Sequence, residues 1–122
     1  TPPPAGTLVA APREVLETAV SVLVDNAFRY TPRGGSVALS SEVSDGSLRL
    51  AVRDTGPGVD ADDAPRVFER MFRGRAGKAS GGGFGLGLAL ARRLARSVRG
   101  EVALENPGEP GARFSVRFPL GG

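Results

Sequence analysis

A glycine-rich segment over residues 77–88 constrains this chain more than any other feature, because six of its first eleven residues are glycine. The segment continues without a break into residues 89–96, an alanine-, leucine- and arginine-rich stretch that favours a helix. Glycine lets the backbone approach a ligand closely, and unpaired N–H groups at a helix N-terminus attract phosphate. The segment therefore predicts a nucleotide or phosphate site, and the alternative is a surface loop with a glycine hinge.

The spacing of these residues excludes two familiar phosphate motifs. A P-loop requires glycine five residues before the Gly-Lys pair and serine or threonine after the lysine, but Phe72 and Ala79 occupy those positions. The dinucleotide pattern G-x-G-x-x-G fails because Leu88 stands three residues after Gly85, and no clear strand leads into the segment. A third kind of phosphate site is needed.

The composition indicates one folded domain and excludes several chemistries. The 122 residues are 40% hydrophobic and 24% charged, with no apolar run of membrane-spanning length and no visible signal peptide. Cysteine is absent, which excludes disulfides, and histidine is absent, which excludes a catalytic or phosphorylatable histidine within these residues. The net charge of +3 allows nucleic-acid binding, but few aromatic residues accompany the arginines, so that footprint is weakly supported.

The order of predicted elements places helices on one face of a sheet. Residues 1–6 carry three successive prolines and are expected to be a linker from a missing domain. A long helix is expected from Arg13 to Tyr30, where apolar residues recur at helical spacing until Pro32 ends the pattern. The other expected elements are strands at 7–10, 36–43, 47–54, 101–105 and 112–118, with helices at 62–71 and 86–99. This order fits helices layered on one face of a mixed sheet.

Three functional side chains share one face near the end of the first helix. Asn26, Arg29 and Tyr30 stand at positions i, i+3 and i+4, so an amide, a guanidinium and a phenol ring lie on one stripe. Such a stripe can serve Mg²⁺, phosphate and a base, since an amide oxygen is an acceptable ligand for a hard cation. The alternative is a polar helix end with Tyr30 packed into the core.

A carboxylate followed by a glycine turn comes directly after the strand at 47–54. Asp54 can accept a hydrogen bond from an exocyclic amine, while Gly56 and Gly58 let the backbone move close to a ligand. Adenine offers an amine there and guanine presents an acceptor, so Asp54 would select the base. The alternative is an ordinary turn in which the aspartate bonds its own backbone.

Basic residues border the glycine segment. Arg70, Arg73, Arg75 and Lys78 would repel one another without an anion. The alternative for residues 68–73 is a short amphipathic helix with an arginine-rich end, which accounts for Phe68.

Four segments resemble, in order, the nucleotide-binding boxes of bacterial sensor histidine kinases. Residues 23–32 resemble the N box, and residues 54–58 resemble the first glycine box. Residues 68–73 resemble the F box, and residues 83–88 resemble the second glycine box. The resemblance covers nearly the whole chain after the linker. It implies the gyrase-like (Bergerat) ATP-binding fold over residues 7–122: an α/β sandwich with a mixed, mostly antiparallel sheet and helices on one face.

The resemblance also implies roles for individual residues. It implies ATP and Mg²⁺ as cofactors, with Mg²⁺ held by Asn26, the adenine amine held by Asp54, and catalytic roles for Asn26 and Arg70. Residues 73–85 would form a mobile ATP lid. The expected ATP-binding residues are Asn26, Arg29, Tyr30, Asp54, Gly56, Gly58, Phe68, Arg73, Gly83, Gly85, Leu86, Gly87 and Leu88.

Two positions depart from the patterns of similar families. Gyrase, the heat-shock chaperone and the mismatch-repair ATPases resemble one another in placing glutamate four residues before the Mg²⁺ asparagine, and anti-sigma serine kinases look similar there. This chain has Val22, which cannot activate water or a serine hydroxyl. Phe84 replaces the small residue usual between the lid glycines, so the docked lid is expected to differ. An anti-sigma-type serine kinase and a non-enzymatic phosphate- or nucleic-acid-binding module stay open as alternatives.

The resemblance implies partners that these residues do not contain. We expect a separate dimerisation and histidine-phosphotransfer domain, joined through residues 1–6, and indirectly a response regulator. The parent is expected to be a homodimeric, membrane-anchored sensor with this domain in the cytoplasm. The chain alone is expected to be a monomer that contacts neither nucleic acid nor membrane and does not phosphorylate itself.

Overall fold

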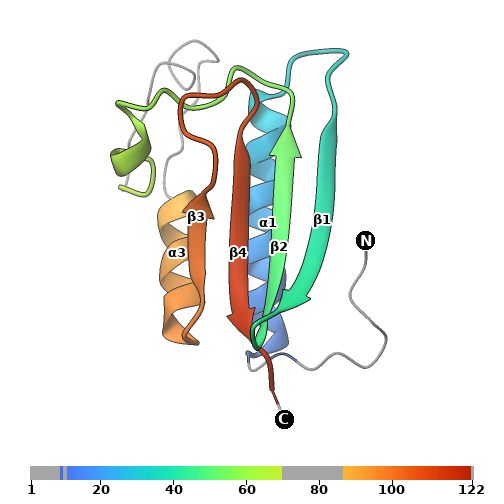
Figure 1. Cartoon of the computed structure of the whole chain (residues 1–122), viewed down its shortest axis with the longest axis vertical. Coiled ribbons are helices and arrows are strands. Elements are labelled where there is room, and N and C mark those ends of the chain that lie inside the picture. The colour runs from blue at the N-terminus through green and yellow to red at the C-terminus, as the bar shows by residue number, and fades with distance from the viewer. Residues whose placement is uncertain (1–8, 10, 70–86, 122) are drawn as a thin grey trace.

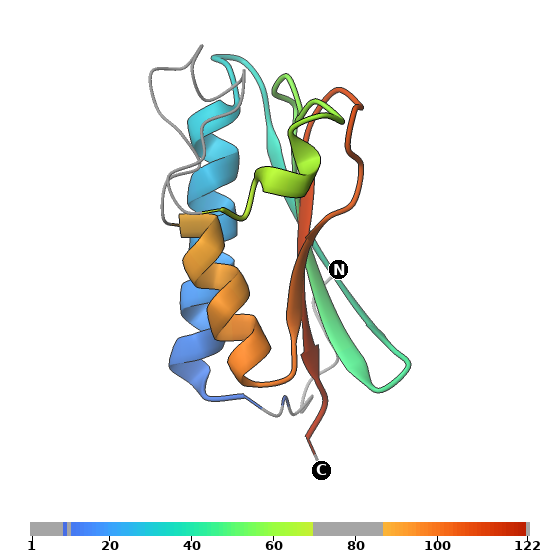
Figure 2. The same ribbon diagram turned by 90° about the vertical axis from the view of Figure 1, so that its left-hand side faces the viewer.

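The computed structural model describes residue 9 and residues 11–69 and 87–121, which form a four-stranded sheet with two helices on one face. The elements are α1 (Arg13–Tyr30), β1 (Val37–Ser44), β2 (Ser47–Asp54), α3 (Gly87–Ser97), β3 (Glu101–Leu104) and β4 (Arg113–Pro119). Figure 1 shows the sheet face-on, and Figure 2 shows α1 and α3 side by side on the same side of it. This arrangement confirms the predicted layering. No helix in the described ranges combines the length and hydropathy needed to cross a membrane.

Every pairing between the described strands is antiparallel, in the order β1-β2-β4-β3. The predicted hairpin of β1 and β2 turns at Asp45 and Gly46, whose φ angles of 50° and 74° suit a two-residue hairpin loop. The hairpin of β3 and β4 inserts β4 beside β2, so the described strands contain no parallel pair. The sheet is therefore more regular than the mixed sheet expected from the sequence.

The hydrophobic core lies between the sheet and the two helices. From α1, Ala19, Leu23 and Ala27 are buried at a spacing of four residues, which places them on one face. From α3, the small residues Ala91 and Ala95 are buried, which allows the two helices to pack closely. The largest fully buried side chains are Phe118, Leu23, Leu88, Val67, Val102 and Val116. Each such side chain contributes about 1.5–3 kcal/mol of stability, so the core fixes the helices against the sheet.

Two predicted elements differ in the part that the structure describes. Of the strand expected at 7–10, the structure describes Val9, which forms an isolated antiparallel bridge with Leu120. Within the helix expected at 62–71, the described part holds one 3-10 turn, η1 (Ala64–Arg66), instead of an α-helix. Pro65 lies in the first turn of η1, where a missing backbone N–H is tolerated.

A left-handed residue fixes the C-terminal end of α3. The helix ends at Ser97, two residues earlier than expected, and Arg99 has a φ of 66°. The N–H of Gly100 then donates to the carbonyl of Ala95 at 2.7 Å, which closes the helix end. This turn directs the chain into β3.

The sheet face away from the helices carries an ionic network. Arg49 on β2 donates through Nε to Glu105 at 2.7 Å, and Arg113 Nε lies 3.1 Å from the same carboxylate. Burial raises the pKa of Glu105, but hydrogen bonds from Arg49 and Ser115 and the charges of the arginines lower it more. The net pKa of Glu105 therefore lies below its usual value.

Candidate functional site

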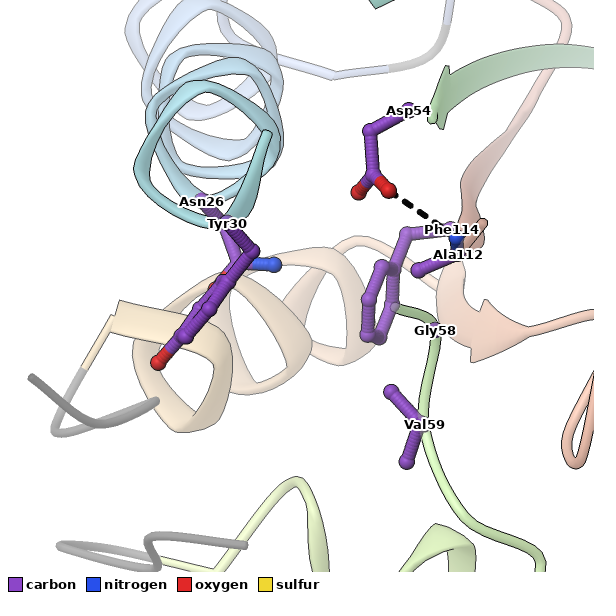
Figure 3. Close-up of a pocket in the computed structure, with 7 residues that line it drawn as sticks. All are labelled: Asn26, Tyr30, Asp54, Gly58, Val59, Ala112 and Phe114. Atoms are coloured by element: carbon purple, nitrogen blue, oxygen red, sulfur yellow. Dashed lines mark hydrogen bonds between the residues drawn. The ribbon is translucent and has the colours of Figure 1, made fainter. Parts of the chain in front are cut away.

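The end of α1, the end of β2 and the loop between β3 and β4 lie at one end of the sheet (Figure 1). Residues of these segments line a pocket. It holds about 210 Å³ of atom-free space, which includes open solvent. The lining residues are Asn26, Tyr30, Asp54, Gly58, Val59, Ala112 and Phe114 (Figure 3).

The carboxylate of Asp54 is buried in the pocket wall and held in one orientation. Its exposure is 3%, and its Oδ1 accepts hydrogen bonds from the N–H of Gly56 at 2.9 Å and of Ala112 at 3.0 Å. Figure 3 shows the other carboxylate oxygen on the side of Asn26 and Tyr30. The geometry therefore presents one fixed acceptor oxygen to the pocket.

The glycine turn after Asp54 packs too closely against neighbouring backbone to carry side chains. A Cβ at Gly56 would overlap the carbonyl oxygen of Tyr30, at the end of α1. Gly58 has a φ of 80°, and a Cβ there would overlap the carbonyl oxygen of Glu109. Gly58 lines the pocket and Gly56 stands behind it, so both predicted glycines belong to the site in different ways.

The loop over residues 105–112 contributes Ala112 to the pocket lining. The sequence analysis did not predict this role for the loop. The N–H of Gly108 donates to the carbonyl of Val59 at 2.8 Å, and the N–H of Gly111 donates to the carbonyl of Gly56 at 2.9 Å. These bonds clamp the loop onto the glycine turn. The available signal was the pair Gly108 and Gly111 within a connection too long for a tight hairpin.

Asn26 and Tyr30 form the α1 wall of the pocket. Both are buried, and Asn26 is 9% exposed with its side-chain amide making no hydrogen bond to another described residue. A buried amide facing a pocket is available to a ligand or a hard cation. The described residues hold no cluster of three or more acidic side chains suited to a metal ion. An amide oxygen is an acceptable protein ligand for Mg²⁺ when phosphate oxygens and water supply the other ligands.

Phe68 supports the pocket from behind. Its ring meets the ring of Phe114 edge-on, with centroids 6.2 Å apart and planes at 90°, and Phe114 lines the pocket. The guanidinium of Arg92 lies 4.6 Å from the centroid of Phe68, and Arg92 also pairs with Glu101 at 3.2 Å. Phe68 therefore positions a lining residue and does not itself line the pocket.

Gly87 lets the N-terminus of α3 lie close to α1. This residue starts α3, and a Cβ built on it would lie 3.3 Å from Cγ1 of Val22 on α1. The N-terminus of α3 therefore abuts α1 one helical turn before Asn26. Leu88 is buried in the core and does not line the pocket.

Other predicted residues do not enter the described pocket. Arg29 is exposed at the end of α1 and is not a lining residue. The expected lid over 73–85 falls outside the described residues. The individual predicted positions that also lie outside them are Arg70, Arg73, Gly83, Gly85 and Leu86.

Comparison with known proteins identifies the family and the fold. The sequence model of the family described as "Histidine kinase-, DNA gyrase B-, and HSP90-like ATPase" matches residues 12–122. The chain is 38% identical over 117 residues to the sensor-like histidine kinase SenX3 of Mycolicibacterium smegmatis, covering 95% of this chain and 30% of that protein. The chain thus spans less than a third of the length of this curated relative.

Solved structures agree with the sequence relatives. The mycobacterial sensor histidine kinase MprB superposes with a TM-score of 0.79 at 31% identity, covering 92% of this chain and 76% of that one. Full-length ShkA in complex with AMPPNP superposes with a TM-score of 0.73 at 32% identity, covering 87% of this chain and 21% of that one. The chain therefore belongs to the histidine kinase-, DNA gyrase B- and HSP90-like ATPase family, within which it is a catalytic ATP-binding domain of the sensor histidine kinase type.

Proposed function

We propose that the chain binds Mg-ATP in this pocket and presents the γ-phosphoryl group to a histidine on a separate domain of the same protein. The observation that carries the proposal is the Asp54 carboxylate, with one oxygen held by two backbone N–H groups and the other on the pocket side. A fixed, buried acceptor matches the exocyclic amine of adenine and opposes the carbonyl of guanine. This geometry favours ATP over GTP.

The other described residues fit the remaining parts of the nucleotide. The rings of Tyr30 and Phe114 flank the space beside Asp54, and a base lying against an aromatic ring gains ~1–3 kcal/mol. The N-terminus of α3 abuts α1 beside Asn26, so a triphosphate running along α1 would meet its N–H groups. In this proposal Arg29, Arg70, Arg73 and the lid glycines contact the phosphates.

Asn26 would hold Mg²⁺ at the boundary between base and phosphates. When bound, this ion neutralises phosphate charge and orients the γ-phosphoryl group for transfer. The Asn26 amide is already buried, faces the pocket and has no described hydrogen-bond partner to give up. Ligand binding there costs little reorganisation of the protein.

Val22 supports a histidine acceptor over water or serine. It stands where a glutamate base acts in the hydrolysing relatives, and its methyl group packs at the start of α3. Water and serine need such a base, whereas a histidine side chain is itself a nucleophile and needs mainly positioning. We therefore favour a histidine kinase over a serine kinase of the same fold.

The rest of the proposed protein lies outside this chain. We propose a dimerisation and histidine-phosphotransfer domain, a response regulator that receives the phosphate, and a homodimeric, membrane-anchored parent with this domain in the cytoplasm. The chain's share of its relatives' length supports the presence of further domains.

Asn26→Ala tests the proposal in two settings. In calorimetric titrations of the chain, the substitution should remove the gain in ATP affinity that Mg²⁺ provides. In the parent protein, it should abolish the acid-labile label that radioactive γ-phosphate leaves on histidine. Thermal melting is the control, since Asn26 donates no side-chain bond to another described residue and its loss should not unfold the chain. Retained phosphotransfer would contradict the role of Asn26.

A further inference from the structure

Asn106, in the loop between β3 and β4, grips the two peptide groups on either side of Ala112. Its Nδ2 donates to the carbonyl of Gly111 at 2.8 Å, and its Oδ1 accepts from the N–H of Arg113 at 2.8 Å. Ala112 is the residue whose N–H holds Oδ1 of Asp54. We propose that Asn106 is a positioning residue for base recognition, acting through Ala112 on Asp54; this inference rests on the proposed function.

The planarity of the peptide bond carries the coupling. The carbonyl of Gly111 and the N–H of Ala112 belong to one trans peptide group, so they point in opposite directions. Asn106 holds the carbonyl side of this group, and Asp54 holds the N–H side. Fixing one side therefore fixes the direction of the other.

Asn106 adds a brace to a peptide group that follows a conformationally free residue, beside the bonds that the sheet and the glycine turn supply. Gly111 has a φ of 71°, and glycine rotates more freely than any other residue. Without the Asn106 bond, the peptide could turn its N–H away from Asp54, whose Oδ1 would then keep only the bond from Gly56. The carboxylate would rotate, and its second oxygen would no longer face the pocket in one position.

An amide is the side chain that this position requires. It supplies one donor and one acceptor at the same time, and both are used here. Aspartate in its place would keep the acceptor for Arg113 but would turn a negative oxygen toward the carbonyl of Gly111. Alanine would lose both bonds. The two substitutions thus separate the amide donor from the volume of the side chain.

The neighbouring residue Glu105 provides a matched control. Its carboxylate pairs with Arg49 and Arg113 on the outer face of the sheet and makes no described contact with the pocket. Glu105→Ala should lower the melting temperature while leaving base recognition unchanged.

Calorimetry tests the inference by measuring two dissociation constants for each variant. One is for ATP, and the other is for purine riboside 5′-triphosphate, which lacks the 6-amino group. The wild-type chain should bind ATP at least about tenfold more tightly than the analogue, because the analogue leaves the Asp54 acceptor unpaired. In Asn106→Ala and Asn106→Asp, this ratio should fall to about threefold or less, through loss of ATP affinity with little change for the analogue.

Three outcomes are distinguishable. A reduced ratio in both Asn106 variants, with the wild-type ratio kept in Glu105→Ala, supports the inference. A wild-type ratio in the Asn106 variants, together with a lower melting temperature, overturns it, because Asn106 would then be structural only. A wild-type chain that does not discriminate between ATP and the analogue overturns adenine recognition by Asp54 and the Asn106 inference with it.

Discussion

Oδ1 of Asp54 accepts a hydrogen bond from the N–H of Ala112 at 3.0 Å, although 58 positions separate the two residues along the chain. Asp54 ends β2, and Ala112 stands directly before β4, so this bond extends the pairing of two neighbouring strands. The N–H of Asp54 returns a bond to the carbonyl of Ala112 at 3.0 Å. The sheet register therefore brings the N–H of Ala112 to the carboxylate before any ligand binds, and Asn106 braces that peptide group.

Asp54→Asn should change the base preference without unfolding the chain. The amide oxygen can still accept from Gly56 and Ala112, which forces the NH₂ group toward the pocket. This donor would face the adenine amine, so ATP affinity should fall by about tenfold to a hundredfold. The same donor matches the guanine carbonyl, so the gap between ATP and GTP should narrow. Competition binding with both nucleotides measures the change, and an unaltered ATP affinity would count against Asp54.

Gly58→Ala should weaken ATP binding and lower stability more than a Gly→Ala substitution elsewhere whose glycine has a similar positive φ. Gly58 has a φ of 80°, and its new Cβ would overlap the carbonyl of Glu109. Gly46 is the matched control, with a φ of 74° and no atom within 4 Å of a built Cβ. Gly46→Ala should cost only about 1–2 kcal/mol of stability and leave ATP binding intact.

Urea unfolding and ATP titration of both glycine variants measure this difference. Gly58→Ala should be the less stable variant and should bind ATP more weakly than Gly46→Ala. Equal losses of stability with intact ATP binding in both would contradict the clamp between the glycine turn and the 105–112 loop.

Phe68→Ala should weaken nucleotide binding although Phe68 does not line the pocket. Removing the ring takes away the edge-on contact with Phe114 and the partner of Arg92. We expect a stability loss of roughly 2–4 kcal/mol and a several-fold lower ATP affinity as Phe114 loosens. Leu39→Ala on β1, where the side chain is 55% exposed, is the control and should cost less than about 0.5 kcal/mol. Unchanged ATP affinity in Phe68→Ala would remove Phe68 from the site.

Glu105→Gln should make the free energy of unfolding depend less on pH in the acidic range. The folded-state pKa of Glu105 is lowered, so its stabilising effect is present above the unfolded pKa and is lost as the pH falls through the folded pKa. The variant should therefore be less stable than wild type at pH 7, by less than about 1 kcal/mol for a partly exposed pair. The difference should shrink as the pH falls from neutral to below the usual pKa of a glutamate, where the carboxylate gains its proton. Urea midpoints across this range check the sign, and a pH-independent difference would contradict it.

Local sequence signals predicted much of the fold and part of the site. The spacing of Leu23 and Ala27 gave the buried face of α1, and Asp45-Gly46 gave the first hairpin with its positive φ angles. Asp54 and Tyr30 were placed in the site by their chemistry, and the structure brings both to one pocket. These features depend on neighbours in the sequence or on the chemistry of single residues.

The features that were missed depend on contacts between distant segments. Nothing near Asn106 or Ala112 in the sequence reveals that their partners are Gly111 and Asp54, because the pairing of β2 with β4 creates those contacts. Phe68 was assigned to the nucleotide through the resemblance of residues 68–73 to the F box, and a ring looks the same in sequence whether it lines a pocket or supports a residue that does. Tertiary packing alone separates these two roles.

Calorimetric titration of the chain with ATP and with GTP in the presence of Mg²⁺, followed in parallel by tyrosine fluorescence, tests the central claim most directly. Tyr30 is the only tyrosine and tryptophan is absent, so the fluorescence reports the proposed base position. The account predicts ATP binding at least about tenfold tighter than GTP binding, with a change in Tyr30 emission that ATP alone produces at matched concentration. Equal binding of the two nucleotides, or tight ATP binding without a tyrosine response, would contradict adenine recognition between Tyr30 and Asp54.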